Sequence, residues 1–229
     1  MVSTGSESGA FDLETVDRLL TTTRAVRKRL DLSRAVPLEV VVECLNIAIQ
    51  APTGSNLQLW RWLIITEQAT RESLAELYRD IPPQAAPTEP EPPPSAQQQR
   101  MLDSAHYLMA HLSEVPVFVV PCTGAVGGAA GWAPSIYPAV WNLILALRSR
   151  GLGSVITTAH LFHRQQAAEL LGIPVGYAQA CLLPVAYYTG TDFKPADRKP
   201  VEEVCYVNRW GNALPGRAGA DRGGPTPLA

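Results

Sequence analysis

Helical and strand-like patterns alternate along this chain of 229 residues, and the alternation limits the folds that it can adopt. Apolar residues at helical spacing, bounded by proline or glycine, predict helices, and short β-branched or aromatic runs predict strands. We expect helices at residues 12–20, 37–48, 69–78, 97–112, 134–150 and 164–171, strands at 60–65, 115–120, 180–188 and 204–207, and an extended segment at 155–158. The first helix is expected to run on into a basic segment at Arg24, and the second to be deeply buried.

The order of these elements favours an α+β domain with a central mixed sheet. A Rossmann domain is not supported, because no G-x-G-x-x-G turn follows a predicted strand and the G-L-G sequence at Gly151 follows a predicted helix. The hydrophobic content of 46% is sufficient for one well-buried domain. We place this domain at residues 12–210, between an N-terminal tail at residues 1–11 and a C-terminal tail at residues 211–229.

A proline-rich segment, IPPQAAPTEPEPPPS, occupies residues 81–95. It contains too much proline for a helix or a central strand, and it lacks the apolar residues for a core of its own. Long irregular loops in compact domains are usually functional lids or disordered segments. We therefore expect residues 81–100 to form a lid loop on the surface.

Composition argues against several classes of function. The formal net charge of -2 gives no field that would favour nucleic acid or an anionic membrane. The N-terminal residues lack the features of a signal peptide, and no apolar run is long enough to span a bilayer, so we expect a cytoplasmic protein. The four cysteines are far apart in sequence, and His160 and His163 have no further clustered ligand, so we expect neither disulfides nor a bound metal.

Three separate segments each suit one part of a phosphorylated aromatic cofactor. The first is the basic stretch Arg24, Arg27, Lys28 and Arg29, in which helical spacing projects Arg24 and Arg27 or Lys28 from one side. Guanidinium groups bind phosphate through directed, charge-assisted hydrogen bonds. Arg198 can close on the same phosphate from the C-terminal side. The alternative for all these residues is a solvated basic surface.

The second segment is the turn PTGSNLQ at residues 52–58, and the third is GLGSVITT at residues 151–158. Asn56 and Gln58 each offer a donor and an acceptor, which the imide edge of a flavin requires. The glycines of the third segment allow the backbone to approach a flat ligand, and its threonine hydroxyls can donate to an acceptor nitrogen. Taken alone, the turn can be a simple helix stop, and the third segment an ordinary helix–strand connection.

Together and in this order, these segments resemble the nitroreductase family over residues 21–210. RAVRKRLDLSRAVP is similar to the family's opening R-x-V-R-x-F-D motif, QAPTGSNLQLWRW to its A-P-S-x-x-N-x-Q-P-W turn, GLGSVITT to its G-L-G-S-x-W-x-T segment, and LLPVAYYTGTDFKPADRKPVEEV to its closing G-x-P-x-x-R-x-P-L-E-E-V region. Three departures stand out: Ala25 replaces a serine, one residue is inserted before Leu30, and Leu59 replaces the proline before Trp60.

The resemblance implies a nitroreductase-like α+β fold with a central mixed, mainly antiparallel sheet flanked by helices. It also implies a homodimer with FMN at the subunit interface. The implied FMN-binding residues are Arg24, Ala25, Val26, Arg27, Lys28 and Arg198 around the phosphate and ribityl chain, Pro52, Thr53, Ser55, Asn56 and Gln58 of the partner chain along the isoalloxazine, and Ile156, Thr157 and Thr158 near N5, where either threonine can form the hydrogen bond.

The activity implied by the resemblance is hydride transfer from NADPH or NADH, through flavin N5, to small electron-poor acceptors such as nitroaromatics or quinones, with ping-pong kinetics. A flavin carries the difficult chemistry itself, so no catalytic side chain is expected, and we interpret His160 and His163 as polar residues near the pocket rim. Trp132 and Tyr137 are candidates to stack on an aromatic acceptor, with surface or core packing as the alternative.

Two other functions are compatible with the same fold. One is reductive dehalogenation, which relies on a lid that pairs with an amino-acid zwitterion, but residues 81–96 contain Glu89 and Glu91 and no Lys or Arg. The other is a protein that sequesters flavin with little turnover. NADPH would bleach a flavin enzyme under anaerobic conditions and would leave a sequestering protein yellow.

Overall fold

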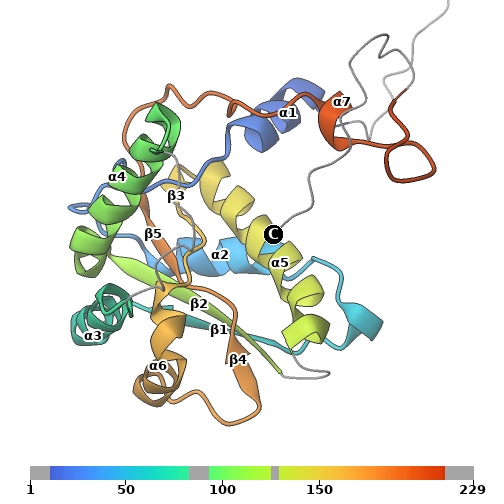
Figure 1. Ribbon diagram of the computed structural model, residues 1–229. Helices are drawn as coiled ribbons and strands as arrows, with labels where there is room; N and C mark the ends of the chain where they lie inside the picture. Colours follow the sequence, from blue (N-terminus) through green and yellow to red (C-terminus); the bar gives the residue numbers. More distant parts are fainter. Residues whose placement is uncertain (1–10, 83–92, 125–128, 215–229) are drawn as a thin grey trace, which may run out of the picture. The chain divides into compact units, whose positions relative to one another are not determined.

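The computed structural model describes residues 11–82, 93–124 and 129–214, and of residues 129–133 only the backbone. The chain divides into a large unit, Met1–Lys194, and a small unit, Pro195–Ala229. The elements of the large unit are α1 (Leu13–Thr22), α2 (Leu38–Ala48), η1 (Gly54–Asn56), β1 (Trp60–Ile65), α3 (Gln68–Arg79), α4 (Ala96–His111), η2 (Leu112–Glu114), β2 (Val117–Gly124), α5 (Ala129–Ser149), β3 (Leu152–Gly153), η3 (Ala159–His163), α6 (Arg164–Leu170), β4 (Tyr177–Gln179) and β5 (Leu183–Tyr187) (Figure 1). The small unit contains α7 (Val201–Val204).

Strand β2 is the centre of an antiparallel sheet. It pairs along most of its length with β1, beginning at Trp60 opposite Thr123. On its other edge, residues 117–119 pair with β5 and residues 122–124 with β4, while β5 pairs in turn with β3. These pairings confirm the expected α+β class and the mainly antiparallel sheet. None of the pairs between described strands is parallel, as a mixed sheet would require.

Helices cover both faces of this sheet, so β2 is buried on each side. Val117 and Val119 pack into a core shared with α2 and α5, whereas Phe118 and Val120 pack into a core shared with α3 and α4 (Figure 1). Successive residues of a strand alternate between its faces. Burial on both faces therefore accounts for the unbroken apolar run that predicted this strand.

Helix α2 buries only one face, so the expectation of deep burial is wrong. Val41, Cys44 and Ala48 are fully buried, but Val42 is 41% exposed and Ile47 is 43% exposed. Apolar residues all around a helix indicate burial on every side. The sequence does not tell whether the same chain or another protein covers each side. Within the described residues, the outer apolar face of α2 has no such cover.

Helix α1 ends before the basic segment, which is not helical as expected. The hydroxyls of Thr21, Thr22 and Thr23 donate to the carbonyls four residues earlier, a side-chain bond that competes with the helical backbone. Three β-branched residues in a row also lower helix propensity. Beyond them the N–H of Val26 bonds to Ser154, so a tertiary contact replaces the next helical hydrogen bond.

Two of the predicted strands also differ from the structure. Within residues 180–188 the strand is shorter than expected: β5 is Leu183–Tyr187, and a separate strand, β4, precedes it at Tyr177–Gln179. The strands are separate because Leu182 forms two backbone hydrogen bonds with Thr157, of 2.8 and 3.1 Å. Residues 204–207 are not a strand: α7 ends at Val204, and only Tyr206 forms an isolated bridge. Pro200 just before α7 and acidic residues in its first turn favour a short helix there.

Most of the predicted lid, residues 83–92, lies outside the described residues. Its C-terminal part is helical, because α4 begins at Ala96. The hydroxyl of Ser95 accepts from the N–H of Gln98, whose side chain accepts from the N–H of Ser95, and this reciprocal pair stabilises a helix start. An irregular lid can therefore extend no further than Ser95.

No helix in the described parts of the chain is long and apolar enough to cross a membrane. Over the same parts, no three His, Cys, Asp or Glu side chains gather as metal ligands. All four cysteines are free thiols, and burial raises the pKa of Cys122 and of Cys181 to about 12. These thiols therefore stay protonated near neutral pH.

His160 is a buried histidine in η3, with 0% of its surface exposed. Neither of its ring nitrogens has a hydrogen bond of normal geometry among the described residues. Burial lowers its pKa to about 4, and the nearby Gln179 amide offsets this effect only in part. This residue is therefore a neutral part of the core and not a polar residue at a pocket rim.

We expect His160 to make folding stability depend on pH. Because its pKa falls from 6.5 in the unfolded chain to about 4 in the folded protein, its contribution is complete above pH 6.5 and is lost as the pH falls toward 4. Between pH 7 and 4.5 the loss amounts to about 2 kcal/mol. Urea unfolding between pH 7 and 4.5 measures it, and His160→Leu should flatten the dependence. An equal loss of stability in the wild type and in the variant would contradict this assignment.

Candidate functional site

The basic segment and residues 151–158 lie side by side in the large unit. The N–H of Val26 donates to the carbonyl of Ser154 at 2.9 Å. The side chain of Val26 lies so close to Gly153 that a β-carbon on this glycine would approach it to 2.9 Å. Leu30 extends the contact through a backbone bridge to Tyr188. The absence of a side chain at Gly153 thus serves the packing of Val26, whereas the sequence predicted an approach to a ligand.

A buried tyrosine connects two of the predicted cofactor residues. The hydroxyls of Tyr78, on α3, and Thr157 lie 2.5 Å apart. The guanidinium of Arg27 is half-buried, which lowers its pKa, and electrostatic interaction with Tyr78 opposes that shift. Tyr78 therefore forms a hydrogen bond with Thr157 and also affects the electrostatics of Arg27.

The other cations of the basic segment differ in their availability. Arg29 forms a 2.8 Å ion pair with Asp192, and its guanidinium carbon lies 4.0 Å from the centre of the Phe193 ring. These contacts hold Arg29 within the protein. Arg24 gives one N–H to a backbone carbonyl at 2.9 Å but is exposed, and so is Lys28. Arg24 and Lys28 are thus free to meet an anion together with Arg27.

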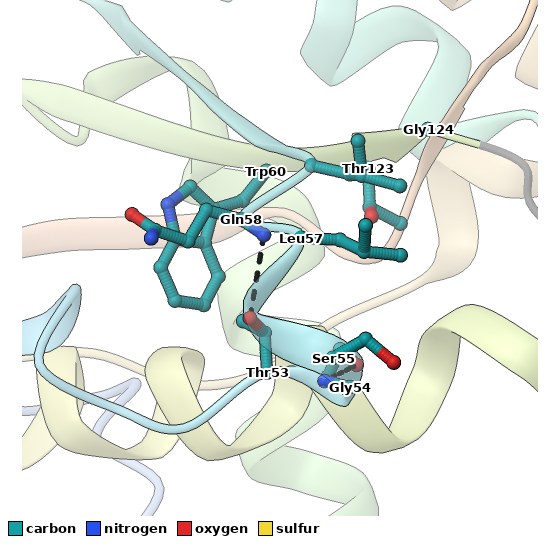
Figure 2. Close-up of a pocket in the computed structure, with 10 residues that line it drawn as sticks. Thr53, Gly54, Ser55, Leu57, Gln58, Trp60, Thr123 and Gly124 are labelled. Carbon is teal, nitrogen blue, oxygen red and sulfur yellow. Dashed lines mark hydrogen bonds between the residues drawn. The ribbon is translucent and has the colours of Figure 1, made fainter.

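The turn after α2 has a strained backbone. Three residues other than glycine have positive φ angles of 50°, 53° and 48°, namely Ser55, Asn56 and Gln58. Such angles are costly for residues with a side chain and persist only where the surroundings hold them. The N–H of Gly54 donates to Ser135 Oγ on α5 at 3.1 Å, and the N–H of Gln58 donates to Thr53 Oγ1 at 3.3 Å (Figure 2).

Two side-chain amides on this turn, those of Asn56 and Gln58, are hydrogen-bonded to each other. The Nε2 of Gln58 donates to the Oδ1 of Asn56 at 3.0 Å, and both side chains are exposed. The bond leaves the amide N–H groups of Asn56 and the carbonyl oxygen of Gln58 available to a ligand. An adjacent donor and acceptor of this kind match an imide, which carries an N–H between two carbonyls.

A cleft of about 180 Å³ lies beside this turn (Figure 2). Its lining comes from the turn, from the start of β1, from the end of β2 and from Ser135 on α5. Neither the basic segment nor residues 151–158 contribute to it. In Figure 1 the cyan turn of η1 lies on one side of α5, and the blue loop that follows α1 lies on the other. The structure thus brings together two of the three predicted segments and leaves the third apart.

The remaining predicted residues have varied surroundings. Ala25, Pro52, Ile156 and Thr158 are exposed, whereas the side chain of Val26 is buried, so only its backbone can face a ligand. Tyr137 donates to the carbonyl of Ala180 at 3.0 Å, and its ring packs against the core. The side chain of Trp132 lies outside the described residues. Arg198 belongs to the small unit, where it is exposed.

Sequence reasoning missed two residues that organise the site. Tyr78 was predicted only as the end of a helix, and Ser135 only as part of the next long one. Each acts through one hydrogen bond to a residue far away in the sequence, of 2.5 Å for Tyr78 and 3.1 Å for Ser135. A single sequence carries no signal for such a pairing.

Comparison with known proteins places the chain in a family. The profile described as the nitroreductase family matches residues 20–187. The chain is 33% identical over 146 residues to protein DrgA of Synechocystis sp., over 57% of this chain and 64% of that protein. It is 30% identical over 174 residues to iodotyrosine deiodinase of Thermotoga neapolitana, over 72% of this chain and 81% of that protein.

The fold is similar to that of the FMN-dependent nitroreductase from Mycobacterium smegmatis in complex with NADPH. The two structures align with a TM-score of 0.65 at 17% identity, over 86% of this chain and 99% of the other. Because the family profile covers well over half of the sequence, including the basic segment, the strained turn and residues 151–158, the chain belongs to the nitroreductase family.

Proposed function

We propose that this protein binds FMN and transfers hydride from NADPH or NADH, through flavin N5, to electron-poor acceptors such as nitroaromatics or quinones. The observation that carries the proposal is the contact of Val26 with Gly153 and Ser154, which brings the basic segment against residues 151–158. Arg27, next to Val26 in the chain, and Thr157 then lie on two segments that contact each other, one suited to a phosphate and the other to flavin N5. The family of the chain and its similarity to an FMN-dependent enzyme support the same cofactor.

The residues present fit the anionic end of FMN. Arg24, Arg27 and Lys28 gather three positive charges on one short segment, and guanidinium groups form paired bonds with phosphate oxygens. Arg27 is half-buried, and a cation removed from water interacts more strongly with an anion. Arg198 of the small unit is proposed as a further phosphate ligand. Arg29 is not, because Asp192 already pairs with it.

The aromatic end of FMN would require a second copy of the chain. Asn56 and Gln58 suit the imide edge of the flavin, but the cleft beside them contains no residue of the basic segment. We therefore propose a homodimer in which each turn completes the site of the other protomer. Thr53, Ser55 and Pro52 would line the ring system with them.

Exposed apolar helices provide the surface for this second copy. Val42 and Ile47 on α2 are joined by Trp141 on α5, which is 42% exposed. A mainly apolar groove of about 500 Å³ lies between α1, α2 and α5, with Leu19 and Leu145 among its lining residues. Contiguous apolar surface of this kind usually marks a protein interface. A two-fold pairing buries the same patch on both protomers.

When bound, FMN supplies hydride acceptance and donation at N5, so the protein only has to bind, orient and shield it. The two histidines near the site do not fit proton donors. His160 is buried and neutral, and His163 is held by Asp80 and Gln166. The acceptor therefore takes its proton from water. The proposed compartment is the cytoplasm, where nicotinamide cofactors are available.

Reductive dehalogenation is the second candidate, because the deiodinase of Thermotoga neapolitana is 30% identical over 72% of this chain. The two activities differ in the acceptor and not in the flavin. Most of the lid that would distinguish them, residues 83–92, lies outside the described residues. A direct comparison of acceptors therefore has to decide between them.

We expect the purified protein to bind FMN. We also expect NADPH to bleach the bound flavin when oxygen is absent. Steady-state kinetics with a nitroaromatic and a quinone should give parallel double-reciprocal lines, as a shuttle through one flavin requires. Faster oxidation of the reduced protein by 3-iodotyrosine than by either acceptor would favour dehalogenation. Bound flavin that nicotinamide cofactors do not bleach would indicate sequestration, and a failure to bind FMN would contradict the proposal.

Ser135→Ala should weaken FMN binding by about three- to tenfold, the effect of one lost hydrogen bond. The variant removes the acceptor for the Gly54 N–H, and the strained turn then no longer holds Asn56 and Gln58 in place. Quenching of flavin fluorescence measures the Kd. Ser73→Ala is the matched control, because among the described residues the Ser73 hydroxyl bonds only to a carbonyl of its own helix, α3. Equal Kd values for the two variants would show that the turn does not depend on Ser135.

A further inference from the structure

Tyr78 has no role in the function proposed above, yet its hydroxyl forms a hydrogen bond with the hydroxyl of Thr157. Its side chain is 6% exposed and lies near the end of α3, which packs against η3 just after Thr157. The two hydroxyl oxygens are 2.5 Å apart, and either can donate. A buried phenol must have a hydrogen-bond partner, and Thr157 provides it.

The backbone of Thr157 is already fixed by other contacts. Its N–H donates to the carbonyl of Leu182 at 3.1 Å, and its own carbonyl accepts from the N–H of Leu182 at 2.8 Å. Only the side-chain rotamer and the direction of the O–H bond are then left to be set. Tyr78 sets the rotamer, because its hydroxyl occupies one side of the Thr157 oxygen. Thr158 is exposed, and the described residues offer its hydroxyl no comparable partner.

The chemistry of the two hydroxyls indicates which of them donates. A hydroxyl has one proton to give and two lone pairs to accept with, so the pair can be arranged in two ways. A phenol is a stronger hydrogen-bond donor than an aliphatic hydroxyl, which favours the arrangement in which Tyr78 donates to Thr157. The proton of Thr157 is then free to point away from Tyr78.

We propose that Tyr78 is a positioning residue that directs the hydroxyl proton of Thr157 at N5 of oxidised FMN. This inference rests on the proposed function and assigns N5 to Thr157 rather than Thr158. N5 of oxidised flavin is an acceptor, and a bond donated to it withdraws electron density from the atom that receives hydride. In that transfer the C–H bond of the nicotinamide ring breaks, its electron pair and hydrogen form the new N5–H bond, and the nicotinamide becomes oxidised. Neither Tyr78 nor Thr157 loses a proton.

A double-mutant cycle on the Kd for oxidised FMN tests this proposal. Tyr78→Phe should weaken binding about three- to tenfold, because the Thr157 hydroxyl loses its fixed direction. Thr157→Val should weaken it at least as much, and the double variant no more than Thr157→Val alone, because Tyr78 acts only through Thr157. Thr157→Ser, which retains the hydroxyl, should restore most of the affinity. Thr158→Val should cost less than Thr157→Val.

The visible spectrum of the bound flavin supplies a readout that general loss of structure does not reproduce. Tyr78→Phe and Thr157→Val should change the shape of the flavin band in the same way, because both remove a directed bond at N5. Tyr107→Phe, the same substitution on α4, should leave both Kd and spectrum unchanged. If Tyr78→Phe does not fold, the comparison of Thr157→Val with Thr158→Val still decides whether N5 belongs to Thr157.

The possible outcomes separate this inference from the proposed function. Independent, additive effects of Tyr78→Phe and Thr157→Val would overturn the role of Tyr78 while FMN binding stands. The same holds if Tyr78→Phe leaves the Kd unchanged. A wild-type protein that does not bind FMN would overturn both the proposed function and the inference.

Discussion

The contact between Val26 and Gly153 is the constraint on which the candidate site depends. Gly153 has no side chain, so Val26 can lie within van der Waals distance of its backbone and donate an N–H to Ser154. At this contact the Val26 N–H bonds to Ser154 and not to a carbonyl of α1, so the basic segment is not helical and lies against residues 151–158. Without it, the cations and the hydroxyl of Thr157 would belong to separate parts of the surface. Any larger residue at position 153 would push the two segments apart.

The antiparallel sheet gives this contact its stability. β3, which contains Gly153, pairs with β5, and β5 pairs with the buried strand β2. The contact of Val26 with Gly153 therefore lies at the β3 edge of the sheet, while the strained turn directly precedes β1, at the opposite end of the strand order. Rigid support allows unfavourable φ angles to persist at Ser55, Asn56 and Gln58. Within one chain, the cleft beside the turn thus contains no residue of the basic segment or of residues 151–158.

Local sequence patterns correctly predicted the helices and strands whose formation depends on residues close to them in the sequence. The strand at Trp60–Ile65 and the helix that ends in Tyr78 follow from β-branched runs and helical spacing, and the structure has both. The expected helix across Arg24 failed because a tertiary bond to Ser154 outcompeted helical bonding. The expected strand at 180–188 is confirmed only over β5, Leu183–Tyr187, because Leu182 pairs with Thr157 instead. The positions of Tyr78 and Ser135 depend on the whole fold, so no local pattern indicated them.

A mixture of two damaged variants tests most directly whether two protomers share each flavin. Arg27→Ala removes a cation from one half-site, and Asn56→Ala removes an amide from the other, so each homodimer has two defective sites. A heterodimer of the two variants, isolated through different tags, contains one site with neither change. We expect it to bind FMN, and to be bleached by NADPH, at about half the wild-type level per dimer. A heterodimer that binds no more FMN than its parents would show that each site lies within one chain.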